Sequence, residues 1–151
     1  MAFYCRKPTR IPGYDYSKCN YYFITICTNE KECIFGSPRN LHAFGNIVKE
    51  HIEEMESHYT SVKVDKFVVM PNHVHMIMIL EAADSNPSIS SIIALFKTGV
   101  TKQIRLQRPD IKVWQRSFHD HIIRNQNSYE KIWNYIDNNP LKWEEDCFYV
   151  R

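Results

Sequence analysis

Several absences narrow the function of this chain before any motif is considered. No apolar run approaches the roughly 20 residues of a membrane span, and the longest apolar stretch, at 68–80, is broken by Pro71, Asn72 and two histidines. The first ten residues, MAFYCRKPTR, lack the apolar segment of a signal peptide. The five cysteines are odd in number and form no CxxC pair, which argues against a disulfide framework or a zinc ribbon. These absences predict a cytoplasmic protein with reduced thiols and no membrane partner.

A large excess of one charge is also lacking, because the formal net charge is only +2. The distribution of charge is more informative than its sum. Between residues 97 and 124 seven basic residues accompany two acidic ones, and a second basic cluster, Arg6, Lys7 and Arg10, lies near the N-terminus. This bias suits a phosphate backbone, but a solvated helix face shows the same pattern, so both interpretations stay open.

Composition and periodicity predict one soluble domain over residues 1–151, with an irregular basic arm at 1–18. Apolar spacing predicts strands at 21–27, 62–69, 73–80 and 113–123, and helices at 41–58, 89–106 and 127–140. Asn127 and Glu130 resemble a capping box at the start of the last helix. The order βαββαβα predicts an α+β fold, in which a mostly antiparallel, ferredoxin-like sheet of the split βαβ type carries helices packed on it.

The strand HVHMIMIL at 73–80 carries the first candidate site. Strand side chains alternate between the two faces, so His73 and His75 share one side with Ile77 and Ile79. Apolar residues on both faces predict an interior strand. Two imidazoles one pleat apart could bind a single divalent ion. Core histidines that are hydrogen-bonded to the backbone would give the same pattern, so the HxH alone does not decide between these readings.

The last predicted helix carries the second candidate site, in the sequence NSYEKIWNYIDNNP. Tyr135 and Asn139 are four residues apart and therefore neighbours on one helix face, while Ile132 and Ile136 point nearer the core. A tyrosine hydroxyl beside a divalent cation can attack phosphorus, and the Asn139 carbonyl offers a third ligand. Two imidazoles with an oxygen ligand suit Mn²⁺ at least as well as Mg²⁺. Alternatively, Tyr135 is an ordinary half-buried tyrosine on an amphipathic helix.

These motifs together resemble a known family. MPNHVHMIMIL is similar to the HUH motif of the single-tyrosine transposases, with Val74 between the histidines, and WQRSFHDHIIRN and YIDNNPLKW resemble their tyrosine-bearing segment. The arm RKPTRIPGYDYS, the strand YYFITICT and the sequence FKTG around Lys97 are similar to the REP-associated tyrosine transposase branch. The resemblance covers nearly the whole chain.

The resemblance implies a metal-dependent single-stranded DNA endonuclease and strand transferase of the HUH fold. In it His73 and His75 correspond to metal ligands and Tyr135 to the nucleophile, and Asn139 stands where many relatives carry Gln. Tyr135 would form a 5′-phosphotyrosine near a DNA hairpin and later religate the strand. Candidate contacts to DNA are the basic residues Lys97, Lys102, Arg105, Arg116, Arg6, Lys7 and Arg10.

Two other functions fit the same sequence. One is a domesticated hairpin-binding protein without catalysis, and the other is a metal-dependent phosphodiesterase that uses water as its nucleophile. The second HxH, His119 and His121, is interpreted as structural in preference to a place at the site. Unpaired bases could stack on Tyr14, Tyr16 or Trp114, although ordinary packing explains these aromatics as well. Both a homodimer and a monomer are compatible with the resemblance, so Tyr135 could complete its own site or a partner's.

Overall fold

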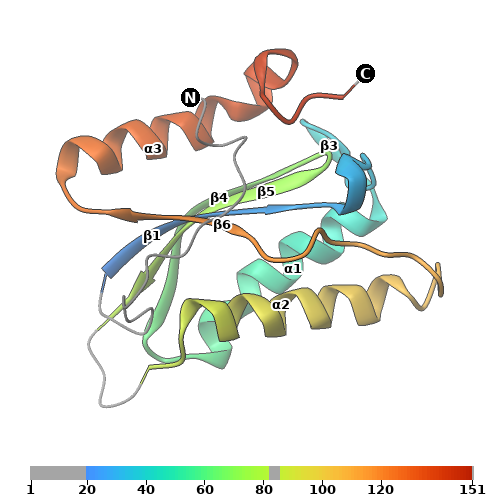
Figure 1. Ribbon diagram of the computed structural model, residues 1–151, viewed down its shortest axis with the longest axis horizontal. Helices are drawn as coiled ribbons and strands as arrows, with labels where there is room; N and C mark the ends of the chain where they lie inside the picture. The colour runs from blue at the N-terminus through green and yellow to red at the C-terminus, as the bar shows by residue number, and fades with distance from the viewer. Residues whose placement is uncertain (1–19, 82–85, 151) are drawn as a thin grey trace.

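A four-stranded antiparallel sheet forms the centre of the computed structural model, which describes residues 20–81 and 86–150. The strand order is β4-β5-β1-β6, built from β1 (Asn20–Cys27), β4 (Val62–Met70), β5 (His73–Leu80) and β6 (His119–Ile123). Helices α1 (Ala43–His58) and α2 (Ile89–Ile104) lie on one face of the sheet, and α3 (Gln126–Asn138) lies on the other (Figure 1). The predicted α+β fold with its split βαβ arrangement is confirmed.

The two faces of the sheet bury two separate apolar clusters. Alternate residues of β1, Tyr22, Ile24 and Ile26, pack with α1 and α2 in the larger cluster. Phe23 and Cys27, which point to the other face of β1, pack with α3 in the smaller cluster. Because both faces are covered, β1 is apolar along nearly its whole length, as a strand inside a sheet must be.

The histidine strand β5 lies in the interior of the sheet, as expected. It pairs with β4 on one edge and with β1 on the other. The tight turn at Pro71 and Asn72 joins β4 to β5, with Met70 opposite His73. Hydrogen bonds along both edges therefore fix the positions of the β5 backbone.

The last strand is shorter than the sequence predicts. β6 begins at His119, and Trp114, expected inside the strand, makes only an isolated bridge to Thr28. Ser117 interrupts the extended backbone with a φ of 68°, a left-handed conformation that a strand cannot contain. The Lys97 ammonium donates hydrogen bonds to the carbonyls of Gln115 and Ser117 and so holds this kink.

The ends of α3 also differ from expectation. The N-cap is Asn125, whose side chain accepts a hydrogen bond from the Ser128 N–H at 2.8 Å, so the predicted capping box at Asn127 is wrong. At its other end α3 runs into the 3₁₀ helix η3 (Asn139–Glu145), whose second residue is Pro140. Asn139 keeps helical backbone angles, φ −57° and ψ −43°, although it precedes proline. Its side chain therefore stays aligned with the end of α3.

A small hairpin lies beside η3, in the stretch between the first strand and the first helix where the sequence predicts neither strand nor helix. Strands β2 (Gly36–Ser37) and β3 (Asn40–Leu41) form it, after the short 3₁₀ helix η2 (Asn29–Lys31). Gly36 has a φ of +115°, and a Cβ there would lie 2.5 Å from the His42 nitrogen. Glycine is therefore required at the start of this turn.

The cysteines only partly follow the sequence prediction. Cys27 and Cys33 are free thiols, and burial raises the pKa of Cys27 to about 12. The prediction of reduced thiols is wrong for Cys147, which is disulfide-bonded. An odd count shows only that at least one cysteine has no partner within the chain, and the lack of CxxC excludes only that spacing, so neither excludes a bond between distant cysteines.

Candidate active site

The two histidines of β5 lie side by side on the face that α3 covers. Both imidazoles are fully buried, and their ring centroids are 4.6 Å apart. Tyr135 on α3 faces the same pair, with its hydroxyl 3.5 Å from the His75 Nε2 and its ring centroid 5.2 Å from that of His75. The strand and the helix that the sequence singled out thus meet in space.

Neighbouring side chains orient each imidazole. The His73 Nδ1 lies 2.8 Å from the Asn72 Oδ1, and the His75 Nδ1 lies 2.7 Å from the Thr25 hydroxyl. An amide oxygen only accepts hydrogen bonds, so His73 carries its proton on Nδ1 and keeps a lone pair on Nε2. A partner that holds Nδ1 in this way is what metal-ligating histidines require. This arrangement favours the ligand interpretation over hydrogen bonds to the backbone.

The Asn72 side chain is itself held on its other side. Its Nδ2 donates to the Lys31 carbonyl at 3.1 Å and to the Phe148 carbonyl at 2.8 Å. These two bonds settle which end of the amide faces His73. The asparagine of the PNHVH sequence therefore fixes the ring of the first histidine.

Asp146 is a third ionisable group at this site, and no sequence motif indicates it. Its Oδ2 lies 3.7 Å from the His73 Nε2, and the ligand atoms of His73, His75 and Asp146 all lie within 4.8 Å of one another. The Asp146 Oδ1 accepts from the Phe148 N–H at 2.8 Å, and its side chain is fully buried. The residue follows η3 in an irregular tail, where no periodicity links it to the HxH. The only available signal was its acidic character shortly after the tyrosine helix.

Asn139 lies beside the carboxylate of Asp146. Its Nδ2 donates to the Asp146 Oδ2 at 2.7 Å, and its side chain is almost fully buried. Two buried polar atoms here, the Asn139 Oδ1 and the His73 Nε2, have no hydrogen-bond partner. Such orphaned acceptors are costly unless something binds them, and a cation would satisfy both. The donor set fits a divalent metal ion.

The electrostatic environment keeps the histidines in the form that binds metal. Burial lowers the pKa of His73 to about 4, although the Asp146 charge and the Asn139 side chain act in the opposite direction. Burial also lowers the pKa of His75 well below its ordinary value, and the neighbouring His73 and His119 add to that shift. Both imidazoles are therefore neutral at pH 7 and offer lone pairs beside one carboxylate.

A cavity of about 310 Å³ adjoins this cluster. Tyr135, Asn139 and Asp146 line its inner side, and residues of α3 and η3 complete it: Asn134, Asn138, Lys142 and Glu145. It has room for a phosphate group beside the tyrosine. We refer to it as the tyrosine cavity.

The predicted DNA-contacting residues are spread over several parts of the molecule. Lys102 is exposed on α2, and Arg105 caps α2 with its Nε donating to the Ile111 carbonyl at 3.1 Å. Both belong to the helix layer opposite α3. Arg116 is exposed before β6, whereas Lys97 is half-buried at the kink described above. The remaining candidates, Arg6, Lys7 and Arg10, lie outside the described residues.

The second HxH lies on the edge strand β6. Thr25 of β1 faces His75 on one side and His119 on the other, so His119 shares the sheet face of the candidate site. His119 is half-buried, and its ring centroid is 6.4 Å from that of Phe148. His121 is exposed. Of the aromatics suggested for base stacking, Trp114 is buried, and Tyr14 and Tyr16 lie outside the described residues.

Comparison with known proteins identifies the family. Residues 15–139 match the family described as IS200-like transposases. The chain belongs to the IS200-like transposase family. A Haemophilus influenzae protein of uncharacterised function is 38% identical over 96% of this chain and 93% of its own length. A second protein of that organism, named as a REP-associated tyrosine transposase, is 28% identical over 85% of this chain and 74% of its own length.

Solved structures agree on the fold of this transposase family member. A REP-associated tyrosine transposase bound to a REP hairpin superimposes with a TM-score of 0.65 at 22% identity, covering 89% of this chain and 74% of that one. A transposase structure from Deinococcus radiodurans gives 0.55 at 16% identity, covering 86% and 96%. In the described ranges, no helix has the length and apolar content needed to cross a membrane.

Proposed function

We propose that this transposase cleaves and rejoins single-stranded DNA through Tyr135, with a divalent metal ion bound beside it. The observation that carries the proposal is the position of the Tyr135 hydroxyl, 3.5 Å from the His75 Nε2 and in the cavity that Asp146 and Asn139 also line. A nucleophile and two oxygen donors thus line one cavity that is large enough for a phosphate, and the buried imidazoles contact this set through Tyr135 and Asp146.

Tyr135 performs the bond exchange. Its phenolic oxygen attacks the scissile phosphorus, the bond from phosphorus to the 3′-oxygen breaks, and the strand is left with a 5′-phosphotyrosine and a free 3′-hydroxyl. Attack of a 3′-hydroxyl on the phosphotyrosine reverses the exchange and reseals a strand. One phosphodiester bond is replaced by another at each step, so no nucleotide cofactor is needed.

The remaining residues hold the ion. His73, His75 and Asp146 offer two nitrogens and one carboxylate, and the Asn139 Oδ1 is a further candidate ligand. A bound divalent cation neutralises phosphate charge and favours the phenolate. Mg²⁺ prefers oxygen ligands, and this mixed set suits Mn²⁺ at least as well. Asn72 and Thr25 orient the imidazoles for this purpose.

The DNA that we assign to this site is a single strand flanked by a hairpin. The support comes from the solved relative that is bound to a REP hairpin. Lys102, Arg105 and Arg116 are exposed cations that can contact its backbone, with Arg6, Lys7 and Arg10 as further candidates. The Lys97 ammonium is bound to two carbonyls, so we assign it a part in shaping the loop before β6.

Replacement of Tyr135 by phenylalanine tests the proposal. Wild-type chain incubated with Mn²⁺ and a hairpin-flanked single strand should give a denaturation-resistant protein–DNA adduct on a gel, and Tyr135→Phe should give none. Binding of the same DNA in a mobility-shift assay should stay within about twofold, because only one hydroxyl is removed. An adduct in Tyr135→Phe would refute the nucleophile. Metal-dependent cleavage by that variant would instead favour a water-using phosphodiesterase.

A further inference from the structure

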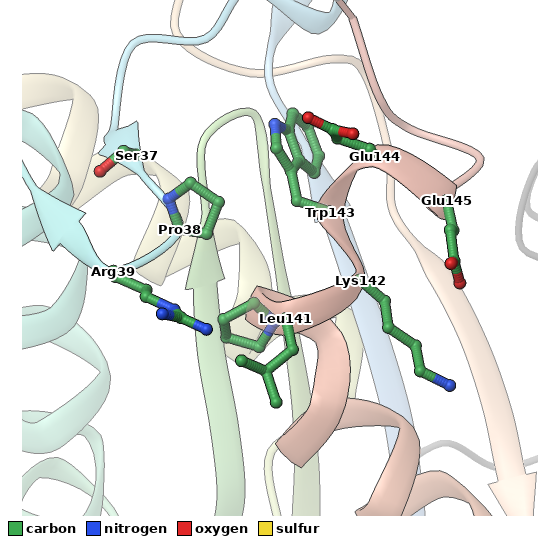
Figure 2. Close-up of a pocket in the computed structure, with 9 residues that line it drawn as sticks. Ser37, Pro38, Arg39, Leu141, Lys142, Trp143, Glu144 and Glu145 are labelled. Carbon is green, nitrogen blue, oxygen red and sulfur yellow. The ribbon is translucent and has the colours of Figure 1, made fainter.

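A second cavity, of about 440 Å³, lies between the β2–β3 hairpin and η3. Residues 37–39 of the hairpin turn form one wall, and residues 140–145 of η3 form the other (Figure 2). We call it the hairpin–η3 pocket. None of the residues proposed above for catalysis or metal binding lines it, so the proposed catalytic chemistry assigns this pocket no role.

This pocket and the tyrosine cavity lie on the same short helix, η3. Lys142 and Glu145 line both spaces. The same 3₁₀ helix begins at Asn139 and is followed directly by Asp146, the two oxygen donors of the candidate metal site. A strand whose scissile phosphate lies at Tyr135 therefore needs to pass only one short helix to reach the pocket.

The walls of the pocket offer the two kinds of contact that a nucleotide requires. Arg39 is exposed and extends from the hairpin toward η3, where Leu141 points back toward it (Figure 2). Leu141 is 65% exposed, and the half-buried Trp143 lies further along the same wall. A guanidinium suits a phosphate group, and exposed apolar and aromatic surface suits the face of a base.

The carboxylates of the pocket restrict where a phosphate can lie. Glu144 and Glu145 belong to η3, and Glu145 and Lys142 extend along the side of η3 that faces away from the hairpin (Figure 2). Arg39 is the one cation on the hairpin wall. The favourable place for a phosphate is therefore beside Arg39, with the base toward Leu141 and Trp143.

We propose that the hairpin–η3 pocket binds the nucleotide of the single strand that adjoins the scissile phosphate. Arg39 contacts its phosphate, and Leu141 and Trp143 support its base. This inference rests on the proposed function, since that function brings a single strand to Tyr135. It adds a site that holds the flank of the strand in line with the tyrosine.

Binding of a short fluorescent oligothymidylate, measured by anisotropy in EDTA, tests the pocket without requiring cleavage. Arg39→Ala should raise Kd by roughly 3- to 10-fold, the effect of losing one solvent-exposed charge contact. It should also lower the slope of log K against log salt by about 0.7, the value for one phosphate contact on a single strand. Leu141→Ala should raise Kd with the salt slope unchanged. Circular dichroism melts establish that both variants fold.

Lys49→Ala is the matched control, because it also removes one exposed cation but lies on α1, does not line the pocket and is not among the cations proposed to contact DNA. It should leave Kd and the salt slope as in the wild type. Wild-type affinity in both Arg39→Ala and Leu141→Ala would overturn the pocket, as would a wild-type chain that does not bind the oligonucleotide. Failure of the proposed function is separately visible, since wild type would then form no adduct with Mn²⁺ whatever the binding results.

Discussion

At the scale of single residues, burial governs the chemistry of His73. The imidazole is kept neutral by desolvation, and the Asn72 amide directs its free nitrogen toward Asp146. A neutral buried histidine is ready to bind a cation, but it lowers the stability of the metal-free protein in acid. The protonation state of the His73 ring therefore affects both metal binding and the free energy of unfolding of the metal-free protein.

The pH dependence of unfolding follows from that link. The unfolded chain protonates His73 near its ordinary pKa of 6.5, whereas the folded chain does so only near 4. The unfolded state therefore binds more protons between these values, and stability falls as the pH drops. Urea unfolding in EDTA should show a loss of about 2 kcal/mol for this residue between pH 7 and pH 5. His73→Leu should show a smaller loss over the same range, and an equal loss would show that His73 does not contribute.

At the scale of elements, α3 is fastened to the sheet of its own chain. The Tyr129 hydroxyl donates to the Asp65 carboxylate, and the Lys66 ammonium lies 2.7 Å from the Asp137 Oδ1 and 4.0 Å from the centre of the Trp133 ring. The hydrogen bond to Asp65 raises the pKa of Tyr129 to about 12. These contacts to β4 flank the buried face of α3 and hold Tyr135 over the histidines of the same chain.

A mixing experiment follows from this attachment. Tyr135→Phe lacks the nucleophile and His73→Ala lacks a ligand, so each variant alone should form no adduct with hairpin-flanked DNA and Mn²⁺. If each tyrosine serves its own chain, an equimolar mixture should also form none, within the detection limit of the gel. Adduct in the mixture would mean that α3 is exchanged between chains. Wild-type protein diluted with either variant is the positive control.

The sequence predicts those helices and strands in which the apolar pattern repeats several times. The two-residue alternation of 73–80 and the helical spacing around Tyr135 placed the histidines and the phenol correctly on facing surfaces. Asp146 could not be predicted, because its position depends on how η3 turns after Pro140 and not on a repeating pattern. The shortened β6 depends on a left-handed Ser117, and the N-cap at Asn125 depends on which of two nearby asparagines adopts an extended backbone.

At the scale of the whole molecule, the sheet separates two layers with different roles. The larger apolar cluster packs α1 and α2 on one face, whereas the face under α3 contains the histidines and the smaller cluster. The candidate metal ligands come from β5 in the middle of the sheet and from the tail after η3. An ion at this site would link the chain's C-terminal segment to its central strand.

That link predicts stabilisation by metal. At a Mn²⁺ concentration about 100 times Kd, the tag-free chain should gain about 2.7 kcal/mol, or a rise in Tm of about 5–10 °C over EDTA. Asp146→Asn keeps the shape of the side chain and removes its charge, so it should lose roughly half of that rise at the same Mn²⁺ concentration. Glu144→Gln, an exposed neighbour, is the matched control and should behave as wild type. An undiminished rise in Asp146→Asn would place its carboxylate outside the coordination sphere.

The interior position of β5 has a consequence for the choice of ion. The separation of the two imidazole nitrogens is set by one backbone repeat of a strand bonded along both edges, so it is difficult to adjust without disturbing the sheet. The oxygen donors are free of that constraint because Asn139 lies at the junction of α3 and η3, and Asp146 lies in the segment after η3. A change of metal preference at this site would therefore require substitutions in the segment from Asn139 to Asp146, while β5 and the sheet around it would stay the same.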